Sequence, residues 1–254
     1  MNKKRFIFCT AILLGMILLL PANAAAAPLD LSGIGINFNG DNNEPQAVVD
    51  TVKVFILMTV LTLVPAFMIL TTCFTRVVVV LSFLRSAIGS QQTPPNQILI
   101  GLALFITIFV MQPVYTKVYD EAVTPYLNEQ ITQEKAVAIG SKPIKKFMLE
   151  QTREKDLALF VKEANIQNVE DPLKLSFTVI IPAFIISELR LAFSIGFVLF
   201  LPFLVIDIVV SSILMSMGMF MLPPSMISLP FKLLLFVLVD GWYLVVESLL
   251  HSFS

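Results

Sequence analysis

The sequence predicts an all-α membrane protein, built from kinked helical hairpins with an inserted polar helical domain. Of its 254 residues, 57% are hydrophobic and only 14% are charged, and the mean hydropathy is +0.86. This balance lies far from that of soluble domains. The charges are also concentrated, because residues 113–174 hold 9 of the 17 Lys and Arg and 10 of the 18 Asp and Glu. Two apolar regions therefore flank one water-exposed segment.

Residues 1–24 have the pattern of a cleavable signal peptide. Lys3, Lys4 and Arg5 precede a 14-residue apolar run from Ile7 to Leu20, and Ala22-Asn23-Ala24 supplies an A-x-A cleavage site. Cleavage would remove three positive charges and take the formal net charge from −1 to −4. An uncleaved anchor helix is the alternative. With cleavage, the mature N-terminus would lie outside the cytoplasmic (inner) membrane of a bacterium.

The next segments predict an exported tail and a first helical hairpin. Residues 25–50 are rich in Asn, Asp and Gly, which indicates a flexible tail. Within the hairpin, residues 51–112, a 21-residue apolar run from Val54 to Phe74 is interrupted by Pro65. After a polar turn, the 14-residue run Ile98–Met111 would measure about 21 Å as a helix. A hydrocarbon core is about 30 Å thick, so we expect this helix to fall short of spanning it.

Residues 113–174 predict a polar periplasmic helical domain. Apolar residues recur at helical spacing, as in Ile144, Phe147 and Met148, with charged residues between them. Ser141 followed by Pro143 predicts the start of a helix.

Residues 175–254 predict a second helical hairpin with unusual buried charges. VPAF (Val64–Phe67) and IPAF (Ile181–Phe184) resemble one another, as do the double-proline turns PPNQI and PPSMI, although their offsets of 117 and 129 residues differ. Either two related hairpins or coincidence explains this.

Charged residues inside a membrane are expensive and should face protein or water. The candidates for pairs within or between subunits are Arg76, Glu188, Arg190, Asp207, Lys232 and Asp240.

The sequence argues against an enzyme and against nucleic-acid binding. It contains no phosphate-binding G-x-x-x-x-G-K-[ST] motif and a single histidine, His251, and its net charge of −1 offers no basic surface. Asp207 and Asp240 could form an intramembrane aspartyl dyad only if they shared a site. Structural ion pairing is the simpler interpretation. We therefore expect no catalytic residue, cofactor or metal.

The stretch LMSMGMFMLPP places Met215, Met217, Met219 and Met221 at every second position. At 100° per residue a helix would divide them between two faces, whereas an extended backbone would point all four the same way. Gly218 permits a break in the helix, and two prolines follow. Because methionine is flexible and polarizable, these side chains either fill gaps in a core or form a deformable apolar ring.

Long motifs in both hairpins resemble the FliP/SctR family of type III export-gate proteins. They are PAFIISELRLAFSIGF (Pro182–Phe197), LPFLVIDIVVSSILMSMGM (Leu201–Met219), LPFKLLLFVLVDGW (Leu229–Trp242) and the segment Leu61–Phe105, which includes GSQQTPPNQ. The cleavable signal and the GSQQTPPNQ segment favour the flagellar branch over the injectisome branch.

The resemblance implies the core pore subunit of the flagellar type III protein export gate, in the basal body. Such a subunit forms a homo-oligomer within a helical multi-subunit channel with FliQ and FliR. FlhB and FlhA associate with this channel, which contacts membrane lipid and conducts unfolded rod, hook and filament proteins. The alternatives are an injectisome homologue with virulence cargo and, from another class, a small-solute transporter.

The family also implies a methionine-rich loop that constricts the channel, here Gly218–Leu222. Met219 and Met221 match it, and Phe220 stands where relatives often have a third methionine. We expect these three residues to form the constriction, with Met215 and Met217 either extending the seal or packing. Ser194 is a second departure, since a longer polar or charged residue is usual there.

Overall fold

The computed structural model describes residues 45–90, 93–166, 169, 171–219 and 221–253. The expected signal peptide, most of the expected tail and Phe220 lie outside these residues. The chain divides into two units, residues 1–63 and 64–254, which are described separately.

The described residues form helices and turns and contain no strand, which confirms the predicted all-α class. Three described helical stretches are long and apolar enough to cross a membrane, namely Val52–Leu70, Asn96–Leu127 and Phe177–Ser216. A fourth candidate is the pair Pro224–Leu238 and Gly241–His251, which is bent by 64°.

In the first unit, the described residues belong to helix α2 (Pro45–Leu70), which continues into the second unit. Its apolar side chains, among them Phe55, Ile56 and Leu61, are exposed. The hydroxyl of Thr59 donates to the carbonyl oxygen of Phe55 at 2.8 Å, which satisfies a polar side chain without a partner outside the helix. This is the pattern of a helix that faces lipid or another chain.

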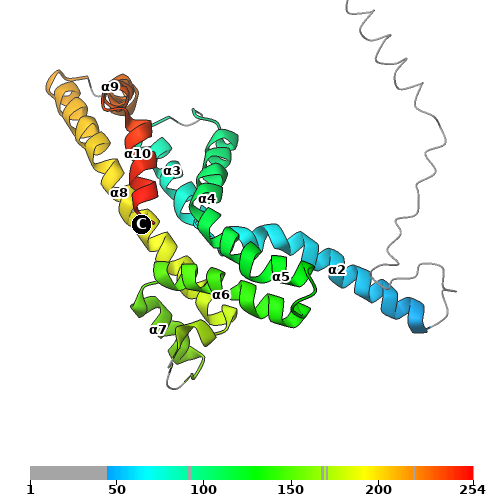
Figure 1. The fold of residues 1–254 in the computed structure, drawn as a ribbon. Helices are drawn as coiled ribbons and strands as arrows, with labels where there is room; N and C mark the ends of the chain where they lie inside the picture. The colour runs from blue at the N-terminus through cyan, green and yellow to red at the C-terminus, as the bar shows by residue number, and fades with distance from the viewer. Residues whose placement is uncertain (1–44, 91–92, 167–168, 170, 220, 254) are drawn as a thin grey trace, which may run out of the picture. The chain divides into compact units, whose positions relative to one another are not determined.

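The second unit is organised around α3 (Phe74–Ile88) and α8 (Phe177–Ser216), which pack against each other. On α3, Val77, Val80, Leu81 and Leu84 recur at helical spacing and are fully or almost fully buried. Their cluster continues through residues of α4 (Asn96–Val118), α8 and α10 (Gly241–His251). Figure 1 shows α8 as the long yellow helix of this unit.

Helix α4 is longer than the sequence predicted. The apolar run ends at Met111, but the helix continues to Val118, and a π-helical turn η2 (Tyr119–Val123) joins it to α5 (Thr124–Leu127). Pro113 lies inside α4, where a proline removes one backbone hydrogen bond without ending the helix. The expectation of a helix too short to span was wrong because polar residues extend the helix beyond its apolar run.

The polar segment contains α6 (Gln133–Gln151), α7 (Glu154–Glu163) and a short 3₁₀ helix η3 (Pro172–Lys174). The predicted helix start at Ser141 and Pro143 was wrong, since α6 begins at Gln133 and includes both residues. A second core cluster lies here, in which Phe147 and Met148 of α6 pack with Phe184 of α8.

The last region is α8, α9 (Pro224–Leu238) and α10. Ser176 caps α8 by accepting a hydrogen bond from the backbone N–H of Thr178. Between α9 and α10, Asp240 adopts a left-handed conformation with φ of 51°. A Cβ added to Gly241 would lie 2.2 Å from the Phe236 ring, so only glycine allows this close approach. Asp240 and Gly241 therefore produce the bend between α9 and α10.

Candidate channel turn and buried charge pairs

The C-terminus of α8 positions the loop Gly218–Leu222, which we call the methionine turn. Gly218 has φ of 73°, its N–H donates to the Met215 carbonyl oxygen at 3.1 Å, and the Met219 N–H donates to the Leu214 carbonyl oxygen at 3.0 Å. These two bonds define a Schellman motif, in which the residue two positions after the C-cap usually packs on the last helical turn. Met219 holds that position, so the motif predicts its contact with Leu214.

The exposure of the four methionines follows from this geometry. Met219 is 40% exposed, whereas Met221, beyond the motif, is 98% exposed. Met215 lies in the last turn of α8 and Met217 is its C-cap, and both are more than half exposed. The four evenly spaced residues therefore lie in different backbone settings.

The turn between α8 and α9 is chemically uniform. From Leu214 to Pro224 the sequence contains no charged residue. Bulky, exposed and flexible apolar side chains of this kind can narrow an aqueous path and exclude water and ions from it. Phe220, the third residue of the expected constriction, lies outside the described residues.

Arg76 and Glu188 form a fully buried ion pair between α3 and α8. The Arg76 Nε donates to Glu188 Oε2 at 3.0 Å, and an η-nitrogen donates to Oε1. The guanidinium also donates to Gln151 Oε1 at 2.8 Å and to the carbonyl oxygen of Ser252 at 2.7 Å, and it lies 4.0 Å from the centre of the Phe253 ring. One cation thus connects α3, α8, α6 and the C-terminal residues.

A second ion pair joins α8 to α9. Lys232, which is buried, donates to Asp207 Oδ2 at 2.6 Å and to the carbonyl oxygen of Ala87 at 3.2 Å. Ser228 donates to Asp207 Oδ1 at 2.6 Å, so both carboxylate oxygens are engaged. An aspartyl dyad with Asp240 would require a free shared site, whereas Asp207 is held by these two donors.

Arg190 and Asp240 are placed differently. Both are exposed, Arg190 on α8 and Asp240 at the bend before α10. Within the part of the chain that the structure describes, neither side chain makes a hydrogen bond or ion pair. Of the six predicted charges, four are therefore brought together in two pairs and two are not.

Sequence reasoning missed a third polar cluster, at the start of α7. Arg153 donates to both carboxylate oxygens of Asp156 at 2.9 Å, and Ser187 of α8 donates to Asp156 Oδ2 at 2.6 Å. The Ser187 hydroxyl, followed by the Arg153 guanidinium, lowers the pKa of Asp156 below its ordinary value. The i, i+3 spacing of Arg153 and Asp156 was the signal available for half of this cluster.

Across the described ranges, no group of three or more His, Cys, Asp or Glu is placed to hold a metal ion. Cys73, a free cysteine, is buried in the second core cluster.

Comparison with known proteins identifies the family. The FliP family model matches residues 57–249. "Flagellar biosynthetic protein FliP" of Bacillus subtilis is 54% identical over 212 residues, which cover 84% of this chain and 96% of that protein. The protein of the same name from Pectobacterium carotovorum is 52% identical over 83% of this chain and 82% of its own length. That from Caulobacter vibrioides is 52% identical over 90% and 85%. The resemblance noted in the two hairpins is thereby confirmed, and the chain belongs to the FliP family of flagellar biosynthetic proteins.

Proposed function

We propose that this chain is a core pore subunit of the flagellar type III protein export gate. In this role it conducts unfolded rod, hook and filament proteins across the cytoplasmic membrane, and the methionine turn is the deformable seal. Several copies assemble with FliQ and FliR in the basal body, and FlhB and FlhA associate with the complex. The flagellar names of the relatives favour this role over an injectisome role.

One observation supports the seal most directly: the exposure of the methionine turn. Met221 is 98% exposed just beyond the C-terminus of α8, in a stretch without charge. A residue whose only role is to fill a core would be covered by its own chain. A flexible apolar side chain that its own chain leaves uncovered suits a surface that closes against itself or against different extended polypeptides.

The role also accounts for the mixture of apolar and charged surfaces. The paired charges of α3, α8 and α9 hold one subunit together, while α2 exposes apolar side chains along its length. A small-solute transporter would function without partner proteins. The gate requires them, so co-purification with FliQ and FliR separates the two functions.

The test of the seal is leakage through the resting gate. Met219, Phe220 and Met221 are replaced together by alanine, and the permeability of the membrane to small ions is measured in non-exporting cells. Met226→Ala is the matched control, because Met226 is an exposed methionine of α9 outside the turn. We expect leakage in the triple variant alone. An assembled complex that contains the triple variant and remains as tight as the control would refute the seal.

A further inference from the structure

Among the described residues outside 113–174, one cation and two carboxylates are placed unusually: Arg190, Asp240 at the bend before α10, and Glu247, which unlike Asp240 lines a groove. Arg190 is exposed on α8, within a stretch apolar enough to cross a membrane, and has no hydrogen bond or ion pair among the described residues. Glu247 on α10 has one polar partner there, the hydroxyl of Tyr243 at 3.2 Å. The two charges do not contact each other within the chain. A charge in apolar surroundings is costly unless it meets a partner.

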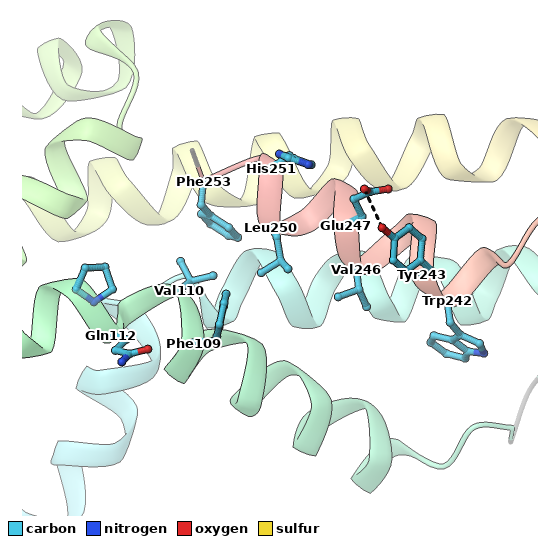
Figure 2. A pocket seen from close by; sticks show the side chains of 11 residues that line it. Phe109, Val110, Gln112, Trp242, Tyr243, Val246, Glu247, Leu250, His251 and Phe253 are labelled. Carbon is cyan, nitrogen blue, oxygen red and sulfur yellow. Dashed lines mark hydrogen bonds between the residues drawn. The ribbon is translucent and has the colours of Figure 1, made fainter.

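Glu247 belongs to a groove between α4 and α10 with a volume of about 860 Å³. Figure 2 shows Val246 and Leu250 directed toward α4, and Tyr243, Glu247 and His251 along another side of α10. The spacing explains this division, because residues 243, 247 and 251 follow one another at four-residue intervals and so form one stripe of the helix. The groove therefore has an apolar floor and a polar edge with one carboxylate.

The lining of the groove suits a guanidinium group. Tyr243 offers an aromatic face beside the carboxylate, Trp242 lies farther along the lining, and Gln112 of α4 adds an amide. Arginine is planar, stacks on aromatic rings and binds carboxylates through two parallel hydrogen bonds. Among the described cations of residues 64–112 and 175–254, Arg76 and Lys232 are held by internal ion pairs and Arg85 donates to Asn96. Arg190 is the exposed cation that these internal contacts leave over.

We infer that the α4–α10 groove binds a second copy of this chain, with Arg190 of that copy paired to Glu247. The inference rests on the proposed function only for the presence of several copies in one complex. Because the surface around Arg190 meets a different surface around Glu247, the contact is heterologous and leaves one unused surface at each end of a row of copies. Such a contact builds a ring or a helix, which a symmetric dimer contact would not.

Charge exchange tests the pairing in the full complex. We expect Arg190→Glu and Glu247→Arg each to lower the yield of intact complex by about tenfold or more, because each places like charges in one apolar contact. The double variant should restore most of the yield. Lys135→Glu is the control, since Lys135 is an exposed cation of α6 outside the groove, and it should leave the yield unchanged. Normal assembly of both single variants would overturn the inference.

A second measurement locates the contact without relying on stability. Cysteines at positions 190 and 247, in a Cys73→Ser background, are treated with a short bis-maleimide in the assembled complex. We expect a ladder of linked copies from the double-cysteine chain and none from either single-cysteine chain. A complex that contains several copies but gives no ladder would refute this contact and leave the proposed function standing. A phospholipid retained in the groove would have the same consequence. A chain isolated only as single copies would refute both.

Discussion

The Arg76–Glu188 pair makes the sharpest prediction about stability. Arg76 uses all five of its N–H donors: two on Glu188, one on Gln151 and two on Ser252. Both charged side chains are completely buried. Replacing Glu188 by alanine leaves the guanidinium in place, removes its counter-charge and leaves two donors without acceptors in the core.

Removing one partner of such a pair costs about 3–5 kcal/mol of the free energy of unfolding. A chain of this size loses about 2–4 °C of melting temperature for each kcal/mol, so Glu188→Ala should melt roughly 6–20 °C lower. Replacing both residues by methionine removes the two charges together and keeps an apolar filling of similar length. Because well-packed apolar replacements of buried pairs are often neutral or better, the double variant should recover much of the loss.

The assay is thermal unfolding of the purified complex in one detergent, followed by tryptophan fluorescence. Arg76→Met, Glu188→Met and the double variant complete a double-mutant cycle with the native protein. The reasoning would be refuted if Glu188→Ala lowered the melting temperature by less than 2 °C. It would also fail if the effects of the two single methionine variants simply added in the double variant.

Three further predictions use the same assay. Gly241→Ala should lower the free energy of unfolding by about 1–3 kcal/mol, because the new Cβ would overlap the Phe236 ring. Gly101→Ala should raise it by about 0.5–1 kcal/mol, because the new Cβ meets nothing within 4 Å in the interior of α4. Equal effects of these two variants would contradict the packing argument. Gly218→Ala should cost about 1–2 kcal/mol, because a left-handed residue with a Cβ is strained, and Gly218→Asn should cost less. The lowered pKa of Asp156 contributes stability that is complete above its ordinary value of 3.8 and is lost as the pH falls below it. Between pH 6 and pH 3 the melting temperature should therefore fall less for Asp156→Asn than for the native protein, and parallel curves would refute this.

The class of fold could be predicted from the sequence because apolar runs report membrane helices directly. The ends of those helices could not. Pro143 was taken as a helix start and Met111 as a helix end, yet α6 and α4 continue through both regions. A proline removes one hydrogen bond, and the many other bonds of a long helix and its packing outweigh that loss. Hydropathy reports where apolar side chains stop, which is a different place from where backbone hydrogen bonds stop.

The charged residues show a second limit of sequence reasoning. All six were recognised as unusual because a charge inside an apolar run always needs an explanation. Their partners depend on tertiary structure, since 112 residues separate Arg76 from Glu188. The sequence therefore could not show that Arg190 differs from Arg76. Only the fold separates the charges that are paired inside one subunit from those that are not.

The methionine turn shows why a regular spacing need not mean a regular structure. Helix α8 ends near Met217, and the left-handed Gly218 reverses the chain, so the four methionines do not lie on one face. What they share is exposure, most of all at Met221. Full burial of a methionine contributes about 1.5–3 kcal/mol, and a single subunit gains almost none of this at Met221. In the proposed gate, the apolar turn of one copy is therefore stabilised by whatever covers it, either the turns of neighbouring copies or a passing polypeptide. These two coverings would compete for the same side chains, and that competition would allow the proposed seal to open for cargo and close behind it.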